Sequence, residues 1–183
     1  AVLFSTKAIL VKLAFRNSQI DVISLLALRM LFSMPFFLLA AWWSAGGNGY
    51  SLSRMDWVKV AGLGLMGYYV SSWFDFEGLQ YISAGLERLI LFLYPSFTAL
   101  INFMVFKQVL AKRQRWALVL TYLGIAIAYY GEFRLDSANQ NFLLGSFLVF
   151  TCSISYAIYM VGSGRMIPKI GVTRFTAFAM LAA

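Results

Sequence analysis

Charged residues inside apolar segments constrain this chain more than any other feature of its sequence. The segment from Ala84 to Phe106 is long enough to cross a bilayer, yet Glu87 and Arg88 lie near its start. Neighbouring apolar segments carry further charges within them or at their ends: Lys7, Arg29, Asp75 and Glu77. An ionised group in hydrocarbon costs at least ~2.5–3.5 kcal/mol, so such groups usually face a bundle interior or a water-filled path. The pattern therefore favours a chain that moves a polar solute over one that only anchors.

The composition sets the fold class. Hydrophobic residues make up 61% of the 183 and charged residues 12%, whereas a soluble domain is about half apolar and a quarter charged. We therefore predict an all-α polytopic membrane protein that has the lipid bilayer as its surroundings. The basic residues lie between apolar segments and form no face, so the net charge of +8 indicates membrane topology and no nucleic-acid partner.

Histidine is absent from the sequence, and the single cysteine, Cys152, lies within an apolar segment. The lack of histidine excludes histidine-ligated metals, b-type haem and serine–histidine catalysis, and one cysteine cannot form an intrachain disulfide. We expect no catalytic residues, no metal and no cofactor. The expected partner is a small-molecule solute, and the sequence leaves the oligomeric state open.

Apolar segments of roughly 17–25 residues predict the membrane spans. The connections between them are short, and none has the composition of a soluble domain. We expect this chain to be part of a larger helix bundle. Five complete spans are predicted at about 22–43, 56–78, 82–106, 114–131 and 142–164, and two partial spans at 1–15 and from 172 to 183.

Lysine and arginine residues are distributed unevenly between the two ends of these spans. The first, third and fifth connections hold only Arg16 and Arg134, and four of the fifteen basic residues lie inside spans. Because cytoplasmic loops carry the excess of basic residues, the even-numbered connections are predicted to be cytoplasmic, and the N-terminal side with them. Those connections and their edges hold nine basic residues: Arg54, Lys59, Lys107, Lys112, Arg113, Arg115, Arg165, Lys169 and Arg174.

The charges inside the spans converge on the predicted outer half of the bundle. At about 1.5 Å per helical residue, Lys7 lies about 13 Å below the outer surface, and Arg29 about 12 Å below it on the next span. The acidic residues end the third span or begin the fourth near the same surface. We predict a charge network of three cations and three anions, with an acidic residue as a candidate proton carrier: Lys7, Arg29 and Arg88, and Asp75, Glu77 and Glu87.

The fourth span has a polar stripe on one helical face that leads to Pro95. Pro95 removes a backbone hydrogen bond and favours a kink, and many transporters build their site near such a break. Two other interpretations remain open, namely hydrogen bonds to neighbouring helices for the small polar residues and a structural ion pair for Glu87 and Arg88. We predict a substrate pathway lined by Lys7, Arg29, Glu87, Arg88, Tyr94, Thr98 and Asn102.

Several segments in order resemble the EamA-type drug/metabolite transporters. They are SAGLERLILFLYPSFTALINFMVF, the basic loop with Gln114, ALVLTYLGIAIAYYG, the lysine-bearing first helix and ALRMLF around Arg29. The resemblance implies ten helices in two inverted five-helix repeats, with residues 1–131 as the first repeat and 142–183 as the start of the second. It also implies export or exchange of amino acids, related metabolites or amphipathic compounds across the bacterial inner membrane, with Glu87 or Glu77 as proton carrier. Where family members commonly carry Gly-Glu, this chain has Lys107-Gln108, so no role is carried over to that position.

Two other classes compete with a transporter. A non-transporting structural or assembly subunit needs the balanced charges only as ion pairs. An integral-membrane enzyme would need a nucleophile–base pair or a metal cluster, which the absence of histidine disfavours. Saturable movement of a solute by the complete protein separates the transporter from both.

The basic asymmetry predicts that Lys112 faces the cytoplasm and that Asn139 faces the opposite side. Cysteines introduced singly at these positions, in a background that lacks Cys152, should differ in labelling by an impermeant maleimide added to intact cells. Position 139 should label and position 112 should not. The reverse labelling would show that the orientation is inverted.

Overall fold

The computed structural model describes residues 2–17, 20–45, 53–107, 111–135 and 141–183. Every secondary-structure element in these ranges is a helix, which confirms the predicted all-α class. The elements are α1 (Val2–Asn17), α2 (Val22–Ala45), α3 (Arg54–Gly64), the π-helical segment η1 (Leu65–Val70), α4 (Ser71–Tyr81), α5 (Ala84–Leu91), α6 (Tyr94–Phe106), α7 (Lys112–Leu135), α8 (Phe142–Ile170) and α9 (Val172–Ala182).

Three helical segments of the described chain are long and apolar enough to cross a membrane: Val22–Ser44, Ala84–Phe106 and Phe142–Ile170. The shorter helix Val172–Ala182 is also apolar. Large apolar side chains such as Trp42, Trp43 and Phe36 are more than 70% exposed, as expected of surfaces that face lipid. The protein is therefore a helical membrane protein, while the full count of spans stays a prediction.

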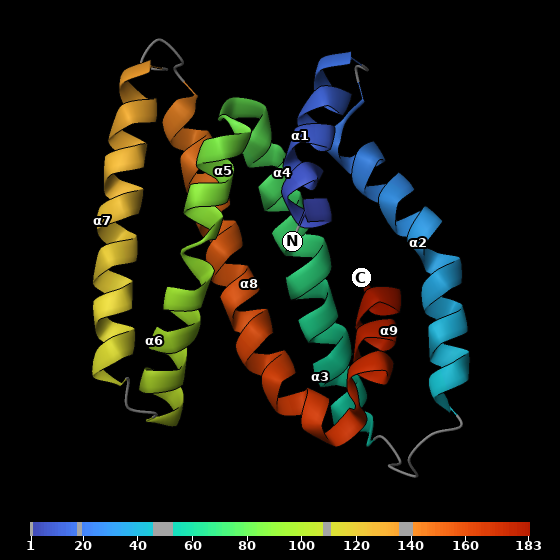
Figure 1. The fold of residues 1–183 in the computed structure, drawn as a ribbon. Helices are drawn as coiled ribbons and strands as arrows, with labels where there is room; N and C mark the ends of the chain where they lie inside the picture. The colour runs from blue at the N-terminus through green and yellow to red at the C-terminus, as the bar shows by residue number, and fades with distance from the viewer. Residues whose placement is uncertain (1, 18–19, 46–52, 108–110, 136–140) are drawn as a thin grey trace.

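Successive helical segments alternate in direction (Figure 1). The C-terminal ends of α1, α4 and α7 lie at one end of the bundle, and those of α2, α6 and α8 lie at the other. The nine basic residues of the even-numbered connections therefore gather at the second end, as the sequence predicts. Asn139 lies outside the described residues.

The predicted third span forms one continuous helical rod, α3–η1–α4. Its start is capped locally, since the backbone N–H of Ser53 donates to Asp56 Oδ2 at 3.2 Å. The rod ends where Ile82 turns to extended backbone. A tight turn leads into α5, where Ser83 Oγ accepts the backbone N–H of Leu86 at 3.1 Å. This capped turn places α5 at the end of α4, so the acidic and basic residues of the two helices lie at one level.

The fourth span is broken, as Pro95 predicts. Phe92 and Leu93 form a turn between α5 and α6, and Pro95 occupies the first turn of α6. A proline is tolerated there because its missing N–H would have no partner within the helix. The break therefore divides the span into two helices, α5 and α6.

The long helix α8 lies at the centre of the bundle and contacts α3, η1, α4, α5, α6 and α9. Glycines allow the close approach of α4, since a Cβ at Gly78 would lie 2.6 Å from Val149 Cγ2 and 2.9 Å from the carbonyl oxygen of Gly145. Gly145 in turn faces Tyr81 and Ile82. Small residues at crossings of this kind are the usual means by which membrane helices associate.

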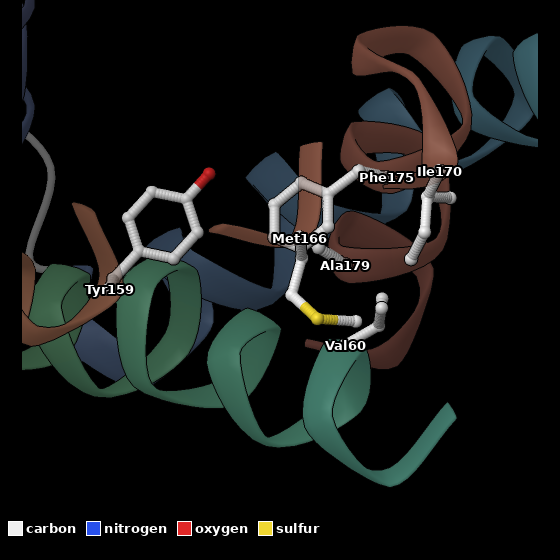
Figure 2. Close-up of a cluster of buried hydrophobic side chains, with 6 residues drawn as sticks. All are labelled: Val60, Tyr159, Met166, Ile170, Phe175 and Ala179. Atoms are coloured by element: carbon white, nitrogen blue, oxygen red, sulfur yellow. The ribbon is translucent and has the colours of Figure 1, made fainter. Parts of the chain in front are cut away.

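A cluster of buried apolar side chains joins α3, α8 and α9 near the basic end of the bundle (Figure 2). Val60 of α3 lies beside Met166 and Ala179 in this view, and Ile170, Phe175 and Tyr159 are the other members of the cluster. Gly171 makes that turn with φ +90°, a conformation that favours glycine. The cluster packs α3, α8 and α9 against one another, and α3 and α9 are in direct contact.

Candidate functional site

A cavity of about 210 Å³ lies among α1, α2, the η1–α4 part of the rod, α8 and the break in the fourth span between α5 and α6. Its wall is rich in polar and ionisable groups, although the helices that form it are apolar. It reaches the break, since Leu91 and Tyr94 from the two sides of that turn both line it. The lining residues are Lys7, Arg29, Gly67, Tyr68, Ser71, Ser72, Asp75, Leu91, Tyr94, Cys152 and Tyr156.

An ion pair between α1 and α4 crosses one wall of this cavity. Lys7 Nζ donates to Asp75 Oδ2 at 2.7 Å. The Asp75 side chain is 6% exposed and that of Lys7 is 27% exposed, so the pair is largely withdrawn from solvent. A charge-assisted bond of this length is strong, and loss of either partner would leave the other buried without compensation.

Arg29 reaches the same cavity from α2. Its Nη1 donates to Ser72 Oγ at 3.1 Å. The ring of Phe76, which is 1% exposed, is shared by the two cations, since Lys7 Nζ lies 4.9 Å and the Arg29 Cζ 5.9 Å from its centroid. Cation–π attraction therefore helps to hold two like charges at one site.

Glu87 lies directly behind this wall, at the start of α5, and is fully buried. Arg88 Nε is 3.2 Å from Glu87 Oε2. The carboxyls of Glu87 and Asp75 interact, and Asp75 Oδ1 receives no hydrogen bond from the described residues. Two carboxylates this close repel one another when both are ionised. The network therefore runs from Lys7 through Asp75 and Glu87 to Arg88.

The π-helical segment η1 forms the floor of the cavity with Gly67 and Tyr68. The Met66 carbonyl in this segment accepts the backbone N–H of Ser71 and also the hydroxyls of Ser71, at 2.9 Å, and of Ser155 from α8, at 3.0 Å. Single π-helical turns of this kind occur frequently at functional sites.

Aromatic side chains line the α8 side of the cavity. Tyr94 and Tyr156 meet edge to face with ring centroids 5.1 Å apart. Tyr68 and Tyr159 also meet edge to face, and their hydroxyl oxygens are 2.7 Å apart in a hydrogen bond. The ring centroids of Tyr156 and Tyr159 are 5.7 Å apart, so the four rings are continuous, and Tyr68, Tyr94 and Tyr156 among them line the cavity.

The structure brings together some of the residues predicted for the pathway and separates others. Lys7, Arg29 and Tyr94 line the cavity together with Asp75, and Glu87 and Arg88 adjoin it.

The remaining predicted residues lie elsewhere. Thr98 Oγ1 donates to the Tyr94 carbonyl at 2.8 Å within its own helix. Glu77 accepts long hydrogen bonds of 3.4 Å from Gln80 and Tyr81 near the end of α4. Thr98, Asn102 and Glu77 are not among the residues that line this cavity.

Sequence reasoning did not single out the contribution of α8. Cys152 and Tyr156 are one helical turn apart and both line the cavity, and Ser155 bonds to η1. A search for polar residues at helical spacing along the sixth span would have found this face. Ser71 and Ser72 were missed because serine is common in membrane helices and carries little signal alone.

A mixed-charge cavity enclosed by apolar helices is typical of a membrane transporter. The comparisons with known proteins agree. The chain matches the EamA-like transporter family over residues 1–130, and it therefore belongs to this family.

One curated relative extends over the whole chain. It is 28% identical over 184 residues to the "Uncharacterized transporter YcbK" of Bacillus subtilis (strain 168). The match covers 100% of this chain and 57% of that protein, so the chain spans little more than half the length of its relative. No solved structure matches the chain.

The Lys7–Asp75 pair predicts a specific pattern of stability. Lys7→Met or Asp75→Asn alone should destabilise the complete protein by roughly 3–5 kcal/mol, because each leaves a buried charge uncompensated. The double variant should recover most of that loss. Thermal unfolding of the four proteins in one detergent measures the cycle, and additive losses in the double variant would show that the two groups do not interact.

Proposed function

We propose that the complete protein is a secondary transporter that exports amino acids or closely related zwitterionic metabolites across the bacterial cell membrane. The observation that carries this proposal is the cavity of about 210 Å³, which presents cations and a carboxylate to one small space. Membership of a transporter family supports the class of activity. The proposed second repeat begins in α8, just beyond the matched residues 1–130.

The charges of the cavity suit a zwitterion. Arg29 directs one donor to Ser72, and its planar guanidinium offers further donors that match a carboxylate. Asp75, whose carboxylate lines the cavity, would accept an ammonium group of the solute. The rings of Tyr68, Tyr94 and Tyr156, which also line the cavity, would contact the apolar part of the solute.

A flux assay separates transport from a structural role. In proteoliposomes that contain the complete protein, a screen of amino acids should identify a solute that moves saturably. The double variant Lys7→Met/Asp75→Asn should insert normally, because its charges are removed together, yet lose tenfold or more of the flux through loss of ~1.4 kcal/mol or more of solute binding. Arg29→Gln should lose flux by a similar factor.

Cys152 supplies a second readout, because its side chain lines the same cavity. Saturating solute should slow its modification by a small methanethiosulfonate reagent. Normal flux in the well-inserted double variant would exclude the proposed site. Absence of saturable movement for every solute tested would favour the structural-subunit alternative.

We further propose that export is coupled to protons through the Asp75–Glu87 pair. A proton shared between the Asp75 and Glu87 carboxyls would form a hydrogen bond between them and remove their mutual repulsion. Release of this proton would accompany solute movement. Glu87→Gln keeps the volume and fixes a neutral group. It should abolish accumulation driven by a pH gradient and leave solute exchange at equal pH within about twofold of the unaltered protein. Glu77→Gln is the matched control, and loss of pH-driven accumulation in that variant alone would transfer the role to Glu77.

A further inference from the structure

A second and larger hollow, of about 990 Å³, lies between α3–η1 and α8 toward the basic end of the bundle. We call it the basic groove. Its floor is apolar, and three cations from two different helices surround it. The lining residues are Val58, Lys59, Gly62, Leu63, Leu65, Met66, Gly162, Arg165, Met166 and Lys169.

The charge of the basic groove is of one sign. Lys59 comes from α3, and Arg165 and Lys169 come from α8, one helical turn apart. No acidic residue is among the lining residues that the structure describes. The cavity described above differs in this respect, since it contains both signs of charge. The groove is therefore complementary to an anion.

The floor requires that this anion carry an apolar part. Met66 and Met166 line it together with leucine and valine side chains. At Gly62 a Cβ would meet nothing within 4 Å, so the floor is open above this residue. Val58 and Leu65 are 67% and 44% exposed, so the apolar surface is accessible from the outside of the helix pair.

The level of the groove in the bundle matches a membrane–water interface. Trp57, beside Val58, packs on Phe178 with ring centroids 4.6 Å apart, and the Arg174 guanidinium lies 5.8 Å from the same Phe178 ring. Tryptophan and arginine are typical of the headgroup level of a membrane. A cationic rim at this level, above an apolar floor, is complementary to a phospholipid with its headgroup at the rim.

We propose that the basic groove binds one anionic phospholipid of the cytoplasmic leaflet. The phosphate lies among Lys59, Arg165 and Lys169, and an acyl chain follows the floor past Gly62. Basic pockets between membrane helices on the cytoplasmic side are known to bind acidic headgroups in this way. The lipid would brace the crossing of α3 and α8 next to the π-helical floor of the cavity, because Met66 belongs to η1 and lines the groove.

The test measures lipid binding to the complete protein in mild detergent by native mass spectrometry, with phosphatidylglycerol and phosphatidylcholine of identical acyl chains as probes. Phosphatidylglycerol should bind at least tenfold more tightly. Lys59→Gln/Lys169→Gln should remove most of that preference. Arg165 is left unchanged because its guanidinium also packs on the Phe106 ring. The control is Lys112→Gln/Arg113→Gln, which removes two cations from α7 at the same end and should keep affinity within about twofold.

A second pair of variants tests the floor without altering charge. Gly62→Leu places a side chain in the open part of the groove and should weaken phosphatidylglycerol binding about tenfold. Gly164→Leu is matched, since a Cβ there also meets nothing within 4 Å but the residue does not line the groove. The Gly164→Leu variant should bind phosphatidylglycerol with unchanged affinity.

Four results would overturn the proposal: equal binding of the two lipids, unchanged affinity in the Lys59→Gln/Lys169→Gln variant, equal effects of the two glycine substitutions, or displacement of the lipid by an equal concentration of glycerol 3-phosphate. The last result would indicate a site for soluble anions. A photoreactive group at position 62 should cross-link to lipid, and cross-linking to another segment of the protein instead would show that protein covers the groove.

Discussion

The ion pair between Lys7 and Asp75 is the interaction on which the arrangement of the site depends. Both side chains are largely withdrawn from solvent, and neither charge could be placed in hydrocarbon alone without a large cost. The pair therefore fixes α1 against α4 at one rotation and one depth. Phe76 follows Asp75 on α4 and receives both Lys7 and Arg29, so the same constraint also orients α2. One buried carboxylate thus organises three helices around the cavity.

The close packing of α4 on α8 completes the cavity from the other side. Gly78 and Gly145 remove the side chains that would separate these helices, and Gly67 permits the same approach at Tyr159. As a result Tyr156 and Cys152 line the same cavity as Lys7, Arg29 and Asp75. The family match ends before α8 begins, yet α8 supplies part of the lining. The site is therefore shared between the matched region and the helix that follows it.

Much of this fold could be predicted from the sequence, because the cost of exposing backbone and charge in lipid leaves few alternatives. The lengths of the apolar segments predicted where the helices lie, and Pro95 predicted the break before α6. Charge in apolar segments selected Lys7, Arg29 and Asp75, since only a polar interior accommodates them. The π-helical turn at Leu65–Val70 could not be predicted, because its sequence suits an α-helix and the wider turn depends on contacts with α8.

Which cation of the predicted network pairs with which anion also could not be decided from the sequence alone. Arg88 forms an ion pair with its neighbour Glu87, which is one of the interpretations that the sequence leaves open for these two residues. Lys7 forms its ion pair with Asp75. Depth along a helix can be counted from the sequence, but rotation about the helix axis decides which opposite charge is nearest. That rotation depends on three-dimensional packing, including the Lys7–Asp75 contact itself, which no count along a single span contains.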